Sequence, residues 1–431
     1  MSWSFLNMRH HDRRHSGHSG PGLRSGIQRA VLTAGPVLLL LGVGARPPAA
    51  NAAEVYNQPA GSLTVEGDTN LDLDPGQRTR TEGNLVSASD LIGIATPDSD
   101  SFIKPRVEYR NYPQDSGDDR VEGYLDFNST WRTQRSSAAV YGTVEHLDEF
   151  NAELPSALYD NLNPVSPTSP ETGKAIIGAT RDSALVVPRY NFKYSPLWGF
   201  GVSGVYQRID YSPSDDIAHV NFAYYFGQAS ATWTLGPRSE LSFGAFDSRY
   251  EAIRYYSNAK GTGGTLDLDT AWTPLLSTTA SLIYDHVNVD TSIPTLFRGS
   301  KDAFGATASV AYKTQISQYR MDAGQYVTPS GGGSLFYTDQ IKAEYDRDLG
   351  PRWSITGALL ALKGRGITSY LQVDNRTYVQ TLAEVVWNLT PTWYLQGGAR
   401  YMWEKYQFNL SGAADTRIYF RIGYKGLPPR R

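Results

Sequence analysis

Apolar and polar residues alternate along most of the chain after residue 100. Within residues 103–111, Ile103, Val107 and Tyr109 fall on one side of an extended chain. The alternate positions carry Lys104, Arg106, Glu108 and Arg110. Because a strand points successive side chains to opposite faces, this segment has one apolar and one hydrophilic face. The same period of two recurs at 121–132, 266–272, 379–389 and 417–424. A helical period is not sustained anywhere, so the sequence predicts an all-β chain.

Short turns separate these segments at regular intervals. Five turns contain a proline, and these prolines are Pro196, Pro237, Pro274, Pro351 and Pro391. They are 41, 37, 77 and 40 residues apart, and proline-free turns fit the gaps at 132–136 and 313–317. The repeating unit of about 39 residues therefore contains two strands, one tight turn and one longer polar loop.

This arrangement predicts a transmembrane antiparallel up-and-down β-barrel with short periplasmic turns and longer extracellular loops. Counting strands from Phe102 to Lys425 gives about sixteen, within a range of about 14 to 18. An even number returns both ends of the barrel to the side of the short turns. The main alternative is a soluble β-propeller, but its blades contain four short strands rather than two long ones.

Aromatic residues flank the short turns. Amphipathic rings favour the interface between lipid and water, so we expect a girdle there. Its predicted members are Trp131, Tyr194, Trp233, Trp272, Trp353, Trp387 and Trp393.

The N-terminal residues have the three parts of a secretory signal peptide. Arginines precede an apolar stretch at 30–45, and Ala50-Asn51-Ala52 follows as a small-x-small cleavage site. A single anchoring helix is the alternative, but glycines and Pro36 interrupt the apolar run. We therefore predict a signal peptide at 1–52, a polar periplasmic lead-in at 53–101, the barrel at 102–425 and a tail at 426–431. The lead-in has room for one hairpin, at 63–71 and 85–95.

Composition narrows the class further. The 431 residues include no cysteine, which excludes disulfide frameworks and Cys-ligated metal centres. The net charge of −3 becomes about −8 without residues 1–52, which argues against a nucleic-acid partner. No run of 18 apolar residues follows residue 50, so helical membrane spans are not expected in the exported chain.

Several short motifs resemble a known family. They are Ser99-Asp-Ser-Phe-Ile-Lys-Pro-Arg-Val107, Trp131-Arg-Thr-Gln-Arg-Ser136 and the Leu-Gly-Pro and Thr-Pro turns. They resemble bacterial outer-membrane β-barrel proteins of the porin type often encoded beside exopolysaccharide genes. The resemblance implies an outer-membrane location in a Gram-negative cell, porin-like use and no catalytic residues. Many such barrels end on an aromatic residue that the assembly machinery recognises, whereas here Lys425–Arg431 follow Tyr424, so recognition would rest on Phe420 and Tyr424.

The sequence contains few candidate catalytic residues. Outside the signal peptide the histidines are His146, His219 and His286, and no G-x-S-x-G elbow accompanies them. Asp118-Asp119 and Asp215-Asp216 are adjacent acidic pairs in loops, without the spacing of a calcium loop. We therefore predict no enzyme activity, no metal and no cofactor.

The polar faces of the strands are predicted to line the lumen. Candidate lining residues are Lys104, Arg106, Glu108, Arg110, Glu122, Asp126, Asp267, Asp269, Arg417 and Arg421. If the first predicted strand closes onto the sixteenth, cations from both strands meet and face acidic residues elsewhere in the wall. Two alternatives stay open for the longest loop, 148–182. It is a mobile surface loop, or it folds into the mouth and narrows the pore, with Asn151, Glu153, Tyr159 and Asp160 as constriction candidates.

The predicted function is passive passage of hydrophilic solutes, saccharides among them, across the outer membrane. The expected partners are membrane lipid, the barrel assembly machinery and small solutes or polysaccharide. Two alternatives stay open: an accessory barrel in exopolysaccharide export, and a non-conducting barrel that serves as a surface receptor or anchor.

Overall fold

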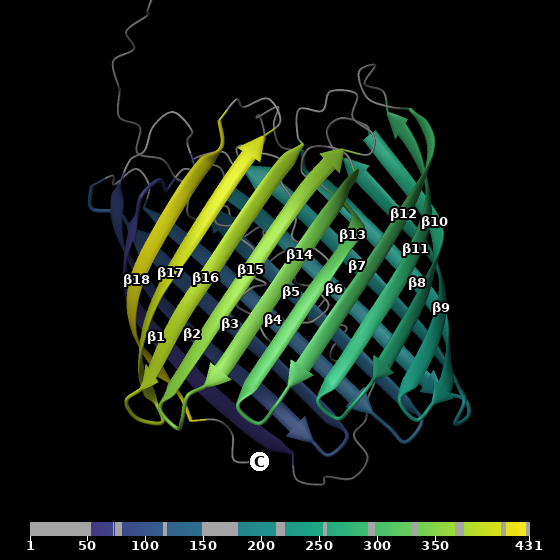
Figure 1. The fold of residues 1–431 in the computed structure, drawn as a ribbon, viewed down its shortest axis with the longest axis horizontal. Coiled ribbons are helices and arrows are strands. Elements are labelled where there is room, and N and C mark those ends of the chain that lie inside the picture. The colour runs from purple at the N-terminus through teal and green to yellow at the C-terminus, as the bar shows by residue number, and fades with distance from the viewer. Residues whose placement is uncertain are drawn as a thin grey trace, which may run out of the picture. The chain divides into compact units, whose positions relative to one another are not determined.

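The computed structural model describes residues 53–71, 73, 80–114, 119–148, 180–212, 220–252, 257–291, 298–329, 335–366, 375–406 and 411–427. All regular structure in these residues is β-strand (Figure 1). None of them forms a helix with the length and apolarity needed to cross a bilayer.

The described residues form eighteen strands. In chain order they are β1 (Glu54–Asp68), β2 (Thr81–Thr96), β3 (Ser99–Asn111), β4 (Arg120–Arg132), β5 (Ser136–Asp148), β6 (Thr180–Lys193), β7 (Trp198–Ser212), β8 (Phe222–Gly236), β9 (Ser239–Ala252), β10 (Ser257–Ala271), β11 (Leu276–Thr291), β12 (Gly299–Lys313), β13 (Ser317–Pro329), β14 (Leu335–Asp348), β15 (Trp353–Gly366), β16 (Arg376–Asn388), β17 (Trp393–Tyr406) and β18 (Ala413–Lys425).

Each strand pairs antiparallel with its neighbours in sequence, and β1 also pairs with β18, so the sheet is closed. This confirms the predicted all-β, up-and-down antiparallel architecture. At the closure, Leu63 of β1 lies opposite Ile422 of β18. The tail adds one more contact there, because the Gly426 N–H donates to the carbonyl oxygen of Pro59 at 2.6 Å. Residues 428–431 of the predicted tail lie outside the described residues.

The predicted count of sixteen strands is wrong by two, and the predicted lead-in accounts for the difference. The segment from Phe102 to Lys425 does hold sixteen strands, β3 to β18. However, β1, β2 and the start of β3 lie within residues 53–101, and β1 and β2 complete the barrel wall. Proline and glycines interrupt the apolar row of β1, and its alternate positions end in Glu66 and Asp68. Alternation in this strand is therefore visible mainly at Leu63 and Val65.

One end of the barrel has short turns, at the positions predicted from the sequence (Figure 1). A side-chain hydroxyl closes most of them by accepting the backbone N–H three residues later, as in Thr390 with Trp393 at 2.9 Å. The same bond forms at Thr96, Thr133, Ser195, Thr273 and Thr314. We call this the short-turn end. The opposite end, where the connections are longer, is the loop end.

The ladder between β12 and β13 is shorter than the strands themselves. It begins at the short-turn end, where Lys313 pairs with Gln318, and stops where Thr307 pairs with Gly324. Towards the loop end, β12 continues to Gly299 and stays paired with β11, while β13 continues to Pro329 and stays paired with β14. Two neighbouring strands of the wall therefore separate over their halves at the loop end.

Candidate functional site: the barrel lumen

The alternation seen in the sequence divides each strand into outward and inward positions. On β3, Val107 and Tyr109 are exposed, as are Leu63 and Val65 on β1 and Phe420 and Ile422 on β18. Large apolar side chains exposed in this way mark the outer face of the barrel. The alternate residues, including Lys104, Arg106, Glu108 and Arg110, are half-buried and are assigned to the inner face.

All ten candidate lining residues fall on inward positions by this register. Arg106 lies over the ring of Tyr124, 3.8 Å from its centroid, and Lys104 is paired in register with Asp126. Glu108 lies 3.8 Å from both Arg106 and Arg110. Glu122 is fully buried and accepts a hydrogen bond from the Tyr124 hydroxyl at 3.0 Å.

The sequence predicted that cations of β3 and β18 would lie on adjacent strands. In the structure β1 and β2 lie between these two strands, and acids of β1 bridge the cations. Arg110 Nη1 of β3 lies 2.9 Å from Glu66 Oε1, and Arg417 Nη1 of β18 lies 3.5 Å from Glu66 Oε2. Arg417 also pairs with Asp68 through Nε and Oδ1. Glu66 and Asp68 are buried acids on β1, so they separate two arginines that would otherwise repel each other. Nothing in the sequence pattern pointed to either acid.

Arg421, the remaining candidate on β18, donates hydrogen bonds to uncharged partners. Its Nε donates to the Thr64 hydroxyl at 2.9 Å, and its Nη1 donates to Gln396 Oε1 at 3.3 Å. Its guanidinium is therefore not neutralised by these hydrogen bonds.

The predicted acidic residues of β10 lie on another arc of the wall. Asp267 accepts a hydrogen bond from Ser281, and Asp269 Oδ1 accepts one from the Thr279 hydroxyl at 2.6 Å. Both donors are neutral. Since β1 and β10 are nine strands apart in an eighteen-strand ring, these acids face the strands that carry Glu66 and its arginines across the lumen.

Charges on the inward positions nearer the short-turn end are unevenly distributed around the ring. Strands β17, β18, β3 and β6 carry mostly cations, and these are Arg400, Arg421, Lys104, Arg106, Arg189 and Lys193. Strands β9, β10, β14 and β16 carry mostly acids, and these are Glu240, Asp267, Asp269, Glu344, Asp346 and Glu384. The exceptions to the pattern are Glu54, Asp100, Asp126, Lys313, Arg320 and Lys342. The lumen thus has a basic arc and an acidic arc.

The chain segment that follows β1 turns into the lumen. Asp415 Oδ1 of β18 accepts the backbone N–H of Thr69 at 3.0 Å and that of Asn70 at 2.9 Å. This anchoring brings Leu71 into an apolar cluster on the inner face of β15, β16 and β17. The cluster contains Leu71, Tyr112, Ala358, Leu360, Leu362, Tyr378, Leu382 and Met402. The sequence placed residues 69–73 in the lead-in, so it gave no sign of this inward segment.

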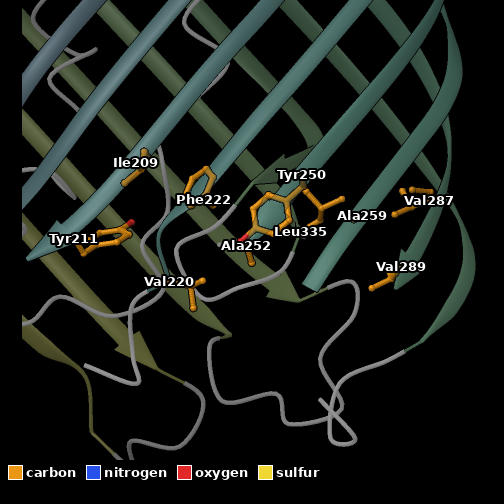
Figure 2. Packing of buried hydrophobic residues seen from close by; sticks show 11 residues of the cluster. Ile209, Tyr211, Val220, Phe222, Tyr250, Ala252, Ala259, Val287, Val289 and Leu335 are labelled. Atoms are coloured by element: carbon orange, nitrogen blue, oxygen red, sulfur yellow. The ribbon is translucent and has the colours of Figure 1, made fainter. Parts of the chain in front are cut away.

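A second apolar cluster lies on the opposite inner wall at the loop end (Figure 2). It joins inward residues of β7 to β12, such as Tyr250, Val287 and Ala303, to Leu335 at the start of β14. Odd-numbered residues of β14 face outward nearer the short-turn end, where Ile341 is exposed, yet Leu335 is buried against the inner face. The loop end of the β13–β14 hairpin therefore leans over the wall formed by β9 to β12.

The predicted constriction residues Asn151, Glu153, Tyr159 and Asp160 lie outside the described residues. The inward features that the structure does describe are the Leu71 segment and the β13–β14 hairpin, both at the loop end.

The predicted girdle residues all lie at the short-turn end. Trp198 stacks on Trp233 with ring centroids 6.0 Å apart, and Trp353 stacks on Trp387 at 5.2 Å. Trp393 meets Tyr424 edge to face at 5.4 Å. Tyr194 and Trp272 are exposed, and Trp131 is half-buried. Each stacked pair joins neighbouring strands across the register, so the rings form part of the outer wall.

Two of the candidate histidines are on outward positions near the loop end. His146 Nδ1 lies 2.6 Å from Asp182 Oδ1, and His286 Nδ1 lies 2.7 Å from Asp302 Oδ1. His219, Asp118, Asp215 and Asp216 lie outside the described residues. Within the described part of the chain, no three His, Cys, Asp or Glu residues are grouped closely enough to hold a metal ion.

Asp119, the described member of its acidic pair, belongs to the connection before β4. It accepts the backbone N–H of Tyr112 at 2.9 Å and the side-chain amide of Asn111 at 3.0 Å. These donors hold the pKa of the Asp119 carboxyl below its usual value. The carboxylate therefore fastens the β3–β4 connection.

Comparison with known proteins found no matching family model and no matching curated protein. Among solved structures, the chain is similar to OccK2 (OpdF) of Pseudomonas aeruginosa in complex with glucuronate, at 11% identity and a TM-score of 0.45, covering 86% of this chain and 98% of that one. OpdK of the same species with vanillate gives 9% identity and a TM-score of 0.43, covering 86% and 98%. OccAB3 of Acinetobacter baumannii gives 11% and 0.42, covering 86% and 99%.

Proposed function

We propose that this chain is a porin-like channel that passes hydrophilic solutes across the outer membrane of a Gram-negative bacterium. The observation that carries the proposal is a closed antiparallel sheet with apolar side chains exposed outside and ionisable ones inside. Closure gives every strand two neighbours and leaves the sheet without a free edge strand, which lipid demands of a structure built from strands. Barrels of about 16–18 strands are wide enough to enclose an aqueous channel.

The orientation follows from the two ends. The signal peptide at 1–52 directs export, the short turns face the periplasm, and the aromatic residues beside them lie at the inner lipid–water interface. The longer connections then lie outside the cell. Phe420 and Tyr424, exposed on β18, are the residues we propose for recognition by the barrel assembly machinery.

The basic and acidic arcs of the lumen support small hydrophilic molecules as the solutes. A basic wall that faces an acidic wall sets up a field across the pore, and this field orients polar and charged solutes as they pass. Arg421, Asp267 and Asp269 carry charges whose described hydrogen-bond partners are neutral, so they are available to a solute. Small hydrophilic molecules, saccharides among them, fit this lining.

Liposome swelling tests the proposal. Vesicles that contain the refolded chain are placed in isotonic solutions of neutral sugars of increasing size. We expect fast swelling with the smallest sugars and a size limit among the larger ones. Vesicles that swell no faster than protein-free ones would contradict a diffusion channel.

One observation favours a second candidate function, a non-conducting receptor or anchor barrel. The Leu71 segment and the β13–β14 hairpin both lean inward at the loop end. If they meet in the membrane they close the mouth, and a correctly folded barrel would then give no swelling with any sugar. An accessory role in exopolysaccharide export rests on the sequence resemblance alone.

A further inference from the structure

The separation of β12 and β13 leaves an interruption in the barrel wall. Beyond Thr307 and Gly324 towards the loop end, the facing edges of these two strands have no ladder pairing, although both strands are fully described. We call this interruption the β12–β13 gap. In hydrocarbon an unpaired backbone group is costly, so such gaps occur only where the backbone is covered or faces an aqueous cavity.

The gap begins within the apolar part of the outer wall. Phe304 of β12 and Leu282 of β11 point outward and are 65% and 58% exposed. Charged outward residues appear only in the next row towards the loop end, where His286 pairs with Asp302. The last apolar row therefore lies beside the unpaired edge of β12.

A groove of about 740 Å³ opens at this place. Its outward-facing lining includes Leu266, Leu282, Tyr284 and Phe304. Gln325 of β13 also lines it, and the Gln325 backbone oxygen packs against Gly305 of β12, so the gap opens beyond this contact towards the loop end. The lining also includes Thr265, Ile283 and Gly305, which occupy inward positions of the same strands. The groove thus reaches into the plane of the wall.

The inner side of the wall is apolar here too. Val287 and Ala303 belong to the buried cluster that Leu335 covers, and Val327 and Tyr337 pack against it. Much of the remaining inner face is polar or charged. An apolar surface therefore continues from the outer wall, past the gap, to the inner wall.

Side-chain contacts take the place of the missing ladder. The Tyr337 hydroxyl of β14 donates to the backbone carbonyl of Asp302 on β12 at 3.4 Å, and Lys301 lies 5.9 Å from the same ring. A hydrogen bond of this length is weak. It joins two strands that are not neighbours, so it can break without disturbing either adjacent ladder.

We propose that the β12–β13 gap is a lateral portal between the lumen and the outer leaflet, which accepts the acyl or aryl chain of an amphipathic solute. The polar part of such a solute stays with the charged lumen while its apolar part passes between β12 and β13 on the loop-end side of the contact between Gly305 and Gln325. Tyr337 is the latch that closes the portal. This function is separate from passage of hydrophilic solutes along the barrel axis.

The absence of cysteine permits a direct test by single-cysteine labelling in proteoliposomes. Ala303→Cys places a thiol on the inner face beside the gap. Ala259→Cys is the matched control, because it belongs to the same cluster but lies on β10, whose ladders to β9 and β11 are continuous. The reagent is a maleimide attached to the end of a phospholipid acyl chain, which is confined to the bilayer.

We expect the lipid-borne maleimide to label Ala303→Cys and to leave Ala259→Cys unlabelled. Adding Ala306→Trp, which fills the groove, should abolish labelling of Ala303→Cys. Adding Ala308→Trp, on the outward face one row closer to the short-turn end, should leave the labelling intact. Adding Tyr337→Ala should accelerate it. Conductance of the same preparations reports whether the axial channel still works.

Equal labelling of the two cysteines would overturn the proposal, because the reagent would then enter by another route. Failure to label Ala303→Cys even in the Tyr337→Ala background would overturn it as well. Either result leaves the axial channel to be judged on conductance alone.

Discussion

Two regions of the lumen, one around β1 and one around β10, differ in how far their ionisable side chains are buried and in the partners of those side chains. Around β1 the acids and arginines are interlocked and buried, with Glu66, Asp68 and Arg417 only 5%, 1% and 4% exposed. Across the lumen, the carboxylates of β10 have only the hydroxyls of β11 as described partners, and Asp269 remains exposed. Removing one partner of a buried ion pair destabilises the fold because the other charge is left buried and unpaired. An exposed charge, in contrast, can act on a solute that passes it. An inward position therefore does not by itself identify a residue that acts on the solute.

The largest effect on stability is expected from Arg417→Met in the buried network around β1. This change leaves Glu66 and Asp68 without their shared partner, and an uncompensated buried charge costs about 3–5 kcal/mol. Urea unfolding of the refolded barrel in micelles, followed by tryptophan fluorescence, measures the loss. Arg421→Met on the same strand is the control and should cost less than about 1.5 kcal/mol, since its partners Thr64 and Gln396 are neutral. Equal losses would contradict the distinction between a charge in a buried ion-pair network and a charge whose hydrogen-bond partners are neutral.

Asp415→Ala tests the anchor of the Leu71 segment. Asp415 accepts the N–H groups of Thr69 and Asn70, and bonds to a charged acceptor contribute about 1.5–3 kcal/mol. We expect a stability loss of about that size together with a higher single-channel conductance, because the segment is released from the inner wall. Asp346→Ala serves as the comparison, since Asp346 also points inward and accepts a hydrogen bond from Thr356. A conductance that stays at the wild-type level would mean that the Leu71 segment does not restrict the pore.

Asp269→Asn tests the exposed carboxylates of β10 in the acidic arc. We expect the preference for cations over anions to fall by a factor on the order of two, since an exposed charge is worth less than about 1 kcal/mol. Reversal potentials in a salt gradient give the ratio, and the unfolding midpoint should not move. A variant that loses stability but keeps its selectivity would place Asp269 with the structural charges instead.

The smallest effect is predicted for Thr279→Ala, which removes the hydroxyl that donates to Asp269 at 2.6 Å. The carboxylate can exchange this donor for water, so the free energy of unfolding should change by less than about 0.5 kcal/mol. Cation preference should be retained. A loss of more than twice that size would show that Asp269 belongs to a network after all.

Most of the barrel could be predicted from the sequence because its outward rows alternate strongly and its turns recur at a fixed spacing. The sixteen strands of residues 102–425 and the turn positions were accessible in this way. The first hairpin was predicted at 63–71 and 85–95 but was assigned to the lead-in and not to the barrel wall, because Pro59, Gly61 and Gly67 weaken the alternation of β1. The hydroxyl that closes most short turns, including Thr96 before Ser99, was a further signal, and it marks the end of β2.

The partners within the lumen could not be read from the sequence. Which strands are neighbours at the closure depends on the total strand count, so an error of two strands hid Glu66 between Arg110 and Arg417. The inward course of Thr69–Leu71 depends on a carboxylate more than 340 residues away, at Asp415. Contacts over such a separation leave no local pattern.

Single-channel recording in planar bilayers tests the central claim most directly. The refolded chain, shown to be inserted and folded, is recorded in concentrated salt at both polarities. An enclosed aqueous lumen predicts discrete, long-lived conductance steps with a roughly linear current–voltage relation. Folded, inserted barrels that never produce such steps would contradict the channel and leave the receptor or anchor function in its place.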